Sequence, residues 1–518
     1  MNSKAAILLS MLLLAAPAFS AEKLTFSNPV LPGDYPDPSV IRVGDEYWAT
    51  ATTSEWAPLF PILKSKDLVK WEHVANAFEK RPDWSVGNYW APEISEHKGT
   101  YFIYYVGRKR GGPLSIAAAT APHPSGPWTD HGPMIGQEAG SIDPVTIVDE
   151  SGDRYLIWKE DGNSRKRPTP LWLQKLSPEG TKLIGEMKEI MRNDAIWEAN
   201  LIEGPYVLRR NGWYYLFYSG NACCGRGCNY ALGVARAKRL SGSWEKYEHN
   251  PILAGNAEWI CPGHGSIVSD SSGRDFLLYH AYHAKTFVYV GRQGLLDEIT
   301  WQPNGWPVIN GNNGPSTNAT ITASAGGLDF VDDFASPKLR PQWQWPQNNH
   351  PDARIERGFL QLRPANSNAA DVVAAIAAVK TTTANYVATT ALDATSLAAD
   401  SKAGLAAYGD RENALGVVSD GTTVTLWRRQ RNKTDIVTVA DAPKSTTLLF
   451  RMTAHDGHRF KFAMSGDARQ WQAIGSDMDV EGEHLPPWDR GIRVALTSGG
   501  SERANARFDF LRVENSPR

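Results

Sequence analysis

Five ionisable residues stand at similar distances before five aromatic segments of the sequence. Each precedes its segment by 8–12 residues, and the four carboxylates among them lie beside or near a proline. The five residues are Asp37, Glu93, Asp143, Glu203 and His264. Any one of these acids could be a turn residue that caps a hairpin. Because such a residue recurs at a similar distance before every aromatic segment, we favour side chains that share one cavity. Carboxylates in one cavity repel each other, which separates their pKa values. One protonated and one ionised carboxyl group are what hydrolysis of a glycosidic bond requires.

The aromatic segments form a repeat with the size of a four-stranded unit. Their first residues lie 54, 54, 59 and 62 positions apart, and a glycine-centred turn precedes each segment. The segments are residues 47–50, 101–105, 155–158, 214–218 and 276–279. Repeats of about 50–60 residues with about four strands are typical of a β-propeller, whereas arrayed β-sandwich domains would need about 100 residues each. We therefore predict an all-β chain that begins with a five-bladed β-propeller.

The pattern changes near residue 326. Fourteen of the 19 tryptophans and all four cysteines precede this point, and the repeat ends there. Strand-like pieces continue, for example at 359–362 and 424–427, and predict a β-sandwich of the jelly-roll type. The predicted domains are the propeller at 21–325 and the β-sandwich at 326–518, with a linker near 310–327 that is rich in Asn, Gly, Ser and Thr.

The N-terminus has the pattern of a secretory signal peptide. Lys4 precedes an apolar stretch at 5–16, and the small residues Ala18 and Ser20 fit a cleavage site before Ala21. The stretch is too short to span a bilayer. We expect residues 1–20 to be removed and the protein to be secreted or periplasmic, without a membrane span. The formal net charge of −2 shows no basic excess, so nucleic acid is not an expected partner.

Three spaced motifs resemble glycoside hydrolase family 43. They are N-P-V-L-P-G-D-Y-P-D-P-S-V at 28–40, S-I-D-P at 141–144 and E-G-P-Y at 203–206. The resemblance covers roughly residues 28–310 and implies a five-bladed propeller and inverting hydrolysis. It also implies that Asp37 is the general base, that Glu203 is the general acid, and that Asp143 tunes and orients this acid. Asp34 is a local alternative to Asp37, but the Asp-Pro-Ser context favours Asp37.

The same resemblance implies further residues at the site. Trp90 is similar to an aromatic residue that stacks on sugar, and Arg292 to the arginine that holds a sugar hydroxyl; with Glu93 they form the expected substrate-binding set. The alternatives are a core tryptophan and a surface arginine. His264 resembles a channel histidine that contacts a structural calcium ion through water, although a satisfied core histidine would look the same. No cofactor is expected to be required for the chemistry.

The cysteines and the residue after Glu203 qualify this resemblance. Cys223, Cys224, Cys228 and Cys261 allow three disulfide pairings, and a zinc site is the alternative, although the usual two-pair spacing is absent. The loop at 221–225 is similar to a vicinal-cysteine loop of some arabinan-cleaving members, in which adjacent cysteines are joined.

Gly204 stands where some members carry alanine, and we expect this difference to matter little.

The resemblance implies an exo-acting enzyme that releases arabinose or xylose from plant-type glycans. The sequence does not separate α-L-arabinofuranosidase from β-D-xylosidase activity. The C-terminal part resembles the concanavalin-like sandwich of many β-xylosidases of this family, which could lend a loop to the pocket or bind glycan. The alternatives are an arabinan- or galactan-cleaving member, a non-catalytic glycan-binding propeller, and a retaining fructan-processing enzyme, whose Arg-Asp-Pro and Glu-Cys motifs are absent here.

Overall fold

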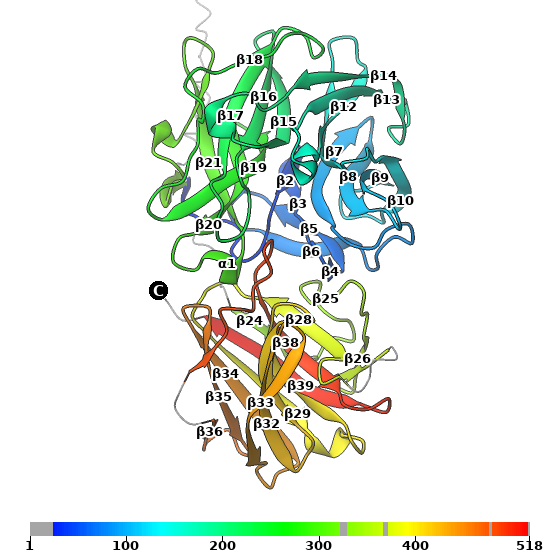
Figure 1. Cartoon of the computed structure of the whole chain (residues 1–518), viewed down its shortest axis with the longest axis vertical. Helices are drawn as coiled ribbons and strands as arrows, with labels where there is room; N and C mark the ends of the chain where they lie inside the picture. The colour runs from blue at the N-terminus through cyan, green and yellow to red at the C-terminus, as the bar shows by residue number, and fades with distance from the viewer. Residues whose placement is uncertain (1–23, 322–328, 366–370, 476–478, 516–518) are drawn as a thin grey trace, which may run out of the picture.

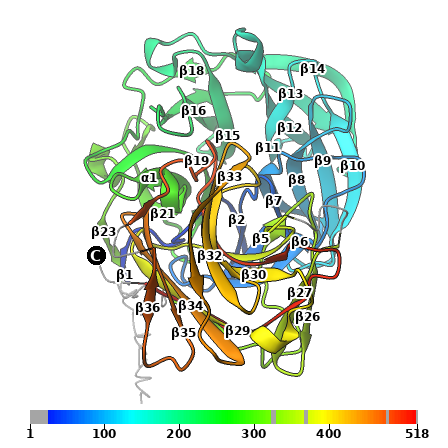
Figure 2. The same ribbon diagram turned by 60° about the horizontal axis from the view of Figure 1, so that its bottom comes forward.

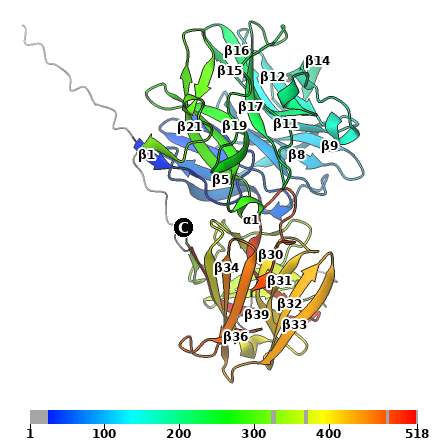
Figure 3. The same ribbon diagram turned by 60° about the vertical axis from the view of Figure 1, so that its left-hand side comes forward.

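The computed structural model describes residues 24–321, 329–365, 371–475 and 479–515. Strands dominate both halves of this part of the chain, and its longest α-helical stretch is the single turn α1 (Phe287–Val290). None of its helices has the length and apolar character needed to cross a membrane. Figures 1 and 3 show two bodies stacked along the longest axis, with the N-terminal sheets above and the C-terminal strands below.

The N-terminal half contains five consecutive sheets of four antiparallel strands each. In every sheet the strands neighbour each other in chain order. The sheets are β2 (Ser39–Val43), β3 (Glu46–Thr50), β5 (Leu59–Ser65) and β6 (Glu72–Phe78); β7 (Trp90–His97), β8 (Thr100–Arg108), β9 (Leu114–Ala121) and β10 (Thr129–Ile135); β11 (Ser141–Val148), β12 (Arg154–Glu160), β13 (Leu171–Leu176) and β14 (Leu183–Met191); β15 (Ile202–Arg210), β16 (Trp213–Gly220), β17 (Ala231–Ala237) and β18 (Glu245–Lys246); and β19 (Trp259–Ser269), β20 (Asp275–His283), β21 (Gln293–Trp301) and β22 (Pro307–Ile309). The five aromatic segments fall in the second strands, β3, β8, β12, β16 and β20, as the repeat predicts.

The five sheets close into a ring. Their first strands, β2, β7, β11, β15 and β19, contact each other in cyclic order, and β19 returns to β2. A hydrophobic cluster joins each neighbouring pair of sheets. One of these clusters packs Leu278 of the fifth sheet with Val40 of the first. The second strands are buried on both faces because each sheet has a neighbour on either side. A two-stranded pair of β1 (Leu24–Ser27) and β23 (Asn318–Ile321) joins the two ends of this half.

The C-terminal half is a sandwich of two antiparallel sheets. Side chains from both sheets, such as Leu405 and Phe450, share one core. The larger sheet contains β24 (Phe330–Asp332), β26 (Asp352–Glu356), β27 (Phe359–Arg363), β29 (Tyr386–Asp393), β34 (Thr447–His455), β35 (Arg459–Ser465), β36 (Gln472–Ile474), β37 (Val480–Glu481) and β39 (Ala506–Asn515). The smaller sheet contains β28 (Ala375–Lys380), β30 (Lys402–Tyr408), β31 (Ala414–Ser419), β32 (Thr423–Gln430), β33 (Lys433–Asp441) and β38 (Arg493–Gly499). In Figure 2 these strands come to the front of the molecule.

Contacts at several places tie the two halves together. Strand β4 (Trp56–Ala57) pairs with β25 (Trp345–Pro346). In addition, the loop between β37 and β38, residues 482–492 and called the sandwich loop below, reaches the first half next to α1, where the Ile492 amide donates to the Tyr289 carbonyl at 3.1 Å. The second tie brings the C-terminal half close to the five first strands.

Candidate active site

A residue with a positive φ angle stands at a matching place in each of the five first strands or shortly before it. These residues are Asp37 (52°), Ala91 (43°), Asp143 (57°), Gly204 (56°) and His264 (40°). Proline follows the first four of them, and Gly265 follows the fifth. The ladders of β7, β11, β15 and β19 shift register here, as at a β-bulge. A bulge bends its strand and re-aims the neighbouring side chains, and such strained positions gather at functional sites.

The positions of these residues differ in part from the equivalence that the sequence predicts for the five ionisable residues. Asp37, Asp143 and His264 occupy equivalent positions, as expected. Glu203, however, precedes its bulge residue by one position, and Glu93 follows Ala91 by two. Counting back from the aromatic segments fails here because a bulge adds a residue to one strand without adding one to its partner.

Asp37 is buried, and both of its carboxylate oxygens accept hydrogen bonds from side chains. Its Oδ1 accepts a hydrogen bond from Arg292 Nη1 at 2.9 Å, and its Oδ2 accepts one from the Thr52 hydroxyl at 2.7 Å. The Nδ1 atoms of His280 and His264 lie 3.2 and 3.3 Å from Oδ1. Burial by itself would raise the pKa of Asp37, but Arg292 above all, and His264 after it, outweigh this effect and hold the pKa well below its usual range. Asp37 is therefore an ionised carboxylate.

Asp143 connects Asp37 to the strand that carries Glu203. Its Oδ2 accepts a hydrogen bond from the Gly204 amide at 2.9 Å and lies 4.0 Å from His264 Nδ1. Burial is the main cause that raises the pKa of Asp143 to about 6, and the charges of Glu203 and Asp37 add to the rise. Asp37 and Asp143 thus differ sharply in their affinity for a proton, which is the separation expected of converging acids.

Glu203 forms a buried ion pair that the sequence did not suggest. Its Oε2 accepts a hydrogen bond from Lys159 Nζ at 2.6 Å, and the same ammonium group donates to Asp161 Oδ1 at 3.0 Å. The Lys159 side chain is only 1% exposed. Burial opposes its charge, but Glu203, Asp161 and Asp143 raise the pKa of Lys159 well above its usual range. Lys159 therefore stays protonated beside Glu203.

Lys159 and His280 are site residues that our sequence reasoning missed. Each lies on a second strand, directly opposite the residue that precedes a bulge: Lys159 opposite Ile142, and His280 opposite Gly263. Both residues come directly after an aromatic segment, and this position in the sequence could have identified them as site residues. His280 Nδ1 accepts the Asp37 amide hydrogen at 3.0 Å, and burial and Arg292 lower the pKa of His280 to about 4. His280 is thus a neutral imidazole.

Glu93 has hydrogen-bond partners of its own, separate from those of Asp37 and Glu203. It accepts hydrogen bonds from the hydroxyls of Ser95 and Thr146, each at 3.1 Å. Burial raises the pKa of Glu93 to about 7. The residue lines a narrow cavity of about 20 Å³, with Asp37 and His264 on its other walls, and this is room for about one water molecule. The structure does not bring Glu93 into hydrogen-bond contact with the other acids among the residues it describes.

The sandwich loop completes the site from the C-terminal half. The Asp489 carbonyl accepts a hydrogen bond from Arg292 Nη2 at 3.3 Å, so Arg292 bridges this loop and Asp37. The ring of Trp488 meets that of Trp90 edge to face, with centroids 6.2 Å apart. Trp90 is half-buried, and Trp488 is 60% exposed. The predicted aromatic residue at the site is thus joined by a second one from the sandwich.

The four cysteines form the disulfides Cys223–Cys224 and Cys228–Cys261. The adjacent pair agrees with the loop resemblance, and the zinc alternative is wrong because every cysteine is in a disulfide. The first pair precedes Gly225, where an added Cβ would lie 3.1 Å from the Trp488 carbonyl oxygen. The disulfide-bonded loop therefore lies directly against the sandwich loop.

The calcium ion expected near His264 would not be coordinated by a cluster of protein side chains among the described residues. Within the described ranges, no group of three or more His, Cys, Asp or Glu side chains is arranged to hold a metal. The Nδ1 atom of His264 faces Asp37 and Asp143, whereas calcium takes six to eight oxygen ligands. Calcium at this site stays a prediction, and no catalytic step below uses it.

Comparisons with known proteins agree with this geometry. A chain segment at 26–307 matches the model of glycosyl hydrolases family 43, and residues 331–514 match the beta xylosidase C-terminal concanavalin A-like domain. Xylosidase/arabinosidase 43B of Humicola insolens is 30% identical over 430 residues, which cover 76% of this chain and 77% of that protein.

Two further relatives differ in how much of them the chain covers. The xylosidase/arabinosidase of Butyrivibrio fibrisolvens is 32% identical over 310 residues, which cover 56% of this chain and 58% of the relative, so the chain spans little more than half of that protein. The crystal structure of the GH43 protein BlXynB of Bacillus licheniformis matches 95% of this chain and 100% of its own, with a TM-score of 0.83 and 25% identity. The protein belongs to glycosyl hydrolases family 43 and is a glycoside hydrolase with a concanavalin A-like C-terminal domain.

Proposed function

We propose that this enzyme hydrolyses the terminal linkage of a glycan with inversion, with Asp37 as general base and Glu203 as general acid. The observation that carries the proposal is the convergence of three acids from three sheets. Asp37 and Asp143 flank His264, and Asp143 binds the amide next to Glu203. Inverting glycosidases need this arrangement, in which one carboxylate activates water and a carboxylic acid protonates the leaving oxygen.

Asp37 has the properties that the base requires. Its carboxylate is held ionised by Arg292, so it can accept a proton from a water molecule at neutral pH. The hydrogen bonds from Arg292 and Thr52 also fix the orientation of both carboxylate oxygens. When the water attacks the anomeric carbon, its proton passes to Asp37.

Glu203 supplies the proton for the opposite side of the linkage. It lies on a different sheet from Asp37, and Asp143, which is placed between them, adds negative charge near both. We assign Asp143 to orienting the Glu203 segment through the Gly204 amide and to tuning the acid through its own negative charge.

The substrate that we propose is a glycan with terminal arabinose or xylose. Two of the relatives named above carry the name xylosidase/arabinosidase. Trp90 and Trp488 offer two aromatic faces beside Arg292, whose guanidinium we assign to a sugar hydroxyl in addition to Asp37. Aromatic faces stack on the apolar faces of sugars. A wall from the sandwich loop favours exo action, because it closes the site on one side.

We also propose the organisation of the whole chain. The closed cycle of first strands and the five shared clusters support a five-bladed β-propeller at 21–325, followed by the sandwich domain at 326–518. Cys228–Cys261 and the adjacent pair suit an oxidising compartment, which supports a secreted or periplasmic protein. The predicted signal peptide at 1–20 lies outside the described residues.

The test combines two variants with one spectroscopic measurement. Asp37→Ala and Glu203→Ala should each lower turnover of arabinoxylan oligomers by at least about 1000-fold, while their circular dichroism and melting temperature stay close to those of the wild type. Proton NMR of the first-formed sugar should show the inverted anomer. A retained anomer, or near wild-type turnover by either folded variant, would refute the assignment.

A further inference from the structure

Lys159 contacts the acid that we assign to the leaving group. Its ammonium group lies 2.6 Å from Glu203 Oε2 and 3.0 Å from Asp161 Oδ1, and its side chain is almost completely buried. Removing a lysine from water costs free energy, which a structure recovers only when the charge meets well-placed opposite charges. The placement of Lys159 at this carboxylate therefore calls for a functional explanation.

We propose that Lys159 is a positioning residue that fixes Glu203 for proton donation and stabilises the carboxylate that donation produces. The inference rests on the proposed function of Glu203. The ammonium group of Lys159 donates a hydrogen bond to Glu203 Oε2. In the part of the chain that the structure describes, Glu203 Oε1 has no hydrogen-bond partner. Oε1 is thus the oxygen that carries the proton to the substrate.

The proton balance shows when the ammonium group acts. As the glycosidic C–O bond breaks, its electron pair stays on the leaving oxygen, which takes the proton from Glu203 Oε1. A negative charge then develops on Glu203 beside Lys159, which keeps its own protons. Because the attraction is stronger for the carboxylate than for the neutral acid, it stabilises the transition state more than the ground state.

The charged groups around Glu203 act in opposite directions. The ammonium group of Lys159 places a positive charge against Glu203, whereas the neighbouring Asp143 adds a negative charge. Tyr230 also faces Glu203 and Asp143 but stays neutral, because burial raises its pKa well above the usual range. Asp161 shares the charge of Lys159 and so weakens its effect on Glu203. The pH dependence of the acid therefore reports the balance among these groups.

The proposal predicts the pH profile of three variants. Lys159→Met removes the charge and should move the basic limb of kcat/KM upward by about 1–3 pH units, because the acid then holds its proton to higher pH. Lys159→Arg keeps the charge and should leave the limb within about 0.5 unit of the wild type. Asp161→Asn concentrates the lysine charge on Glu203 and should move the limb downward, which is the opposite direction.

Leaving-group dependence gives a second readout. On the plateau at low pH, Lys159→Met should lower kcat/KM about 3- to 30-fold for a phenyl glycoside, whose departure needs a proton. For the 2,4-dinitrophenyl glycoside, which departs without one, kcat/KM should change less than about threefold. A lysine that only supported the fold would lower both rates alike and leave the basic limb in place.

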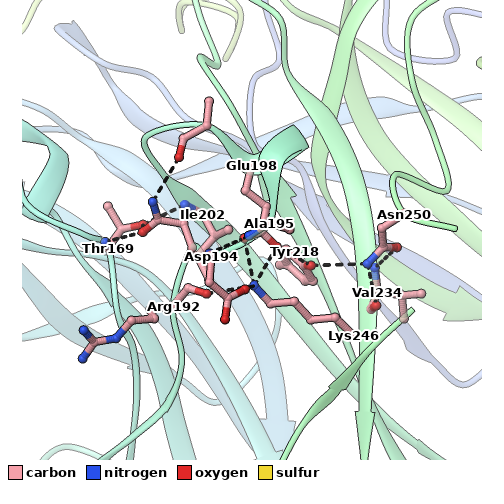
Figure 4. Close-up of polar contacts among 12 residues, drawn as sticks. Thr169, Arg192, Asp194, Ala195, Glu198, Ile202, Tyr218, Val234, Lys246 and Asn250 are labelled. Carbon is pink, nitrogen blue, oxygen red and sulfur yellow. Dashed lines mark hydrogen bonds and ion pairs between the residues drawn. The ribbon is translucent and has the colours of Figure 1, made fainter. Parts of the chain in front are cut away.

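Lys246 provides a matched control. It makes the same kind of double ion pair, at 2.6 Å to Asp194 and 2.7 Å to Glu198, and Tyr218 donates a hydrogen bond to Glu198 as well. Figure 4 shows this cluster beside the loop that precedes β15. Lys246 contacts neither Glu203 nor Asp143 among the described residues, so Lys246→Met removes a comparable lysine without touching the acid. It should leave the basic limb unchanged.

The outcomes separate this inference from the proposed function. Wild-type enzyme that cleaves no aryl arabinoside or xyloside would refute the function itself. Active wild type with an unmoved basic limb in folded Lys159→Met would overturn only the role of Lys159, and so would an equal shift in Lys246→Met. If Lys159→Met does not fold, Asp161→Asn decides: a downward shift supports the inference, and no shift overturns it.

Discussion

The ion pair between Asp34 and Arg493 joins the two halves of the enzyme, and its removal should weaken both stability and catalysis. Asp34 Oδ2 accepts hydrogen bonds from Arg493 Nη2 at 3.1 Å and from the Gly491 amide at 3.2 Å. The two side chains are only 4% and 2% exposed. Asp34→Asn keeps the shape but leaves a buried, uncompensated guanidinium group, although burial already lowers the pKa of Arg493.

The expected loss of stability follows from this burial. Removing one partner of a buried pair costs about 3–5 kcal/mol, which corresponds to a fall of about 5–10 °C in melting temperature for a large domain. Because Gly491 belongs to the sandwich loop, the same change should displace Asp489 and with it the second contact of Arg292. We expect kcat/KM to fall about tenfold at temperatures at which the variant is fully folded, since small misplacements at an active site are costly.

Calorimetry and kinetics on a double-mutant cycle test this prediction. Arg493→Met alone should also destabilise the enzyme, and Asp34→Asn combined with Arg493→Met should recover part of the loss, because no unpaired charge then remains. A melting temperature of Asp34→Asn within about 2 °C of the wild type, or strictly additive effects, would contradict the argument. Unchanged kcat/KM would show that the sandwich loop does not position Arg292.

Two further substitutions test the catalytic centre from different sides. Arg292→Met removes the main cation that holds Asp37 ionised, so the pKa of Asp37 should rise and the acid limb of the pH profile of kcat/KM should move upward by about 1–3 units; an unmoved limb would count against Asp37 as the base. Gly204→Ala places a Cβ 2.8 Å from the His264 ring at a φ of 56°, and it should lower kcat/KM at least about tenfold. Gly212→Ala is the control, because its φ of 73° is similar but the space around the new Cβ is open. It should cost stability and leave kcat/KM nearly unchanged.

The repeat of aromatic segments was sufficient to predict the sheets of the first half. Residues 101–105 and 214–218 are apolar and aromatic because they form second strands that are covered on both faces, and this pattern is legible in sequence. Asp37 and Asp143 could be predicted for a related reason, since a proline follows each of these two residues, which share a positive φ angle.

What the sequence did not reveal depends on pairing across strands and between halves. Lys159 is a polar residue near the end of an apolar strand, and its importance appears only when Ile142 lies opposite to it and Glu203 approaches it from the neighbouring sheet. Asp34 looked like a rival of Asp37, but its partner Arg493 is 459 residues away. The expectation that alanine at Gly204 would matter little is contradicted by the position of His264 against this glycine.

The one-residue offset between Glu203 and the bulge explains how one ring gives its two key acids different environments. Asp37 has a positive φ angle just before β2 and meets Arg292, which keeps it ionised, while its amide donates to His280 of the fifth sheet. Glu203 precedes its bulge residue by one position and so meets Lys159 from the third sheet. A glycine on the bulge itself leaves space for His264 and frees its amide for Asp143. Moving the acid onto the bulge would therefore take it away from Lys159 and press its side chain against His264, so the asymmetry of the repeat is what gives the two acids different partners.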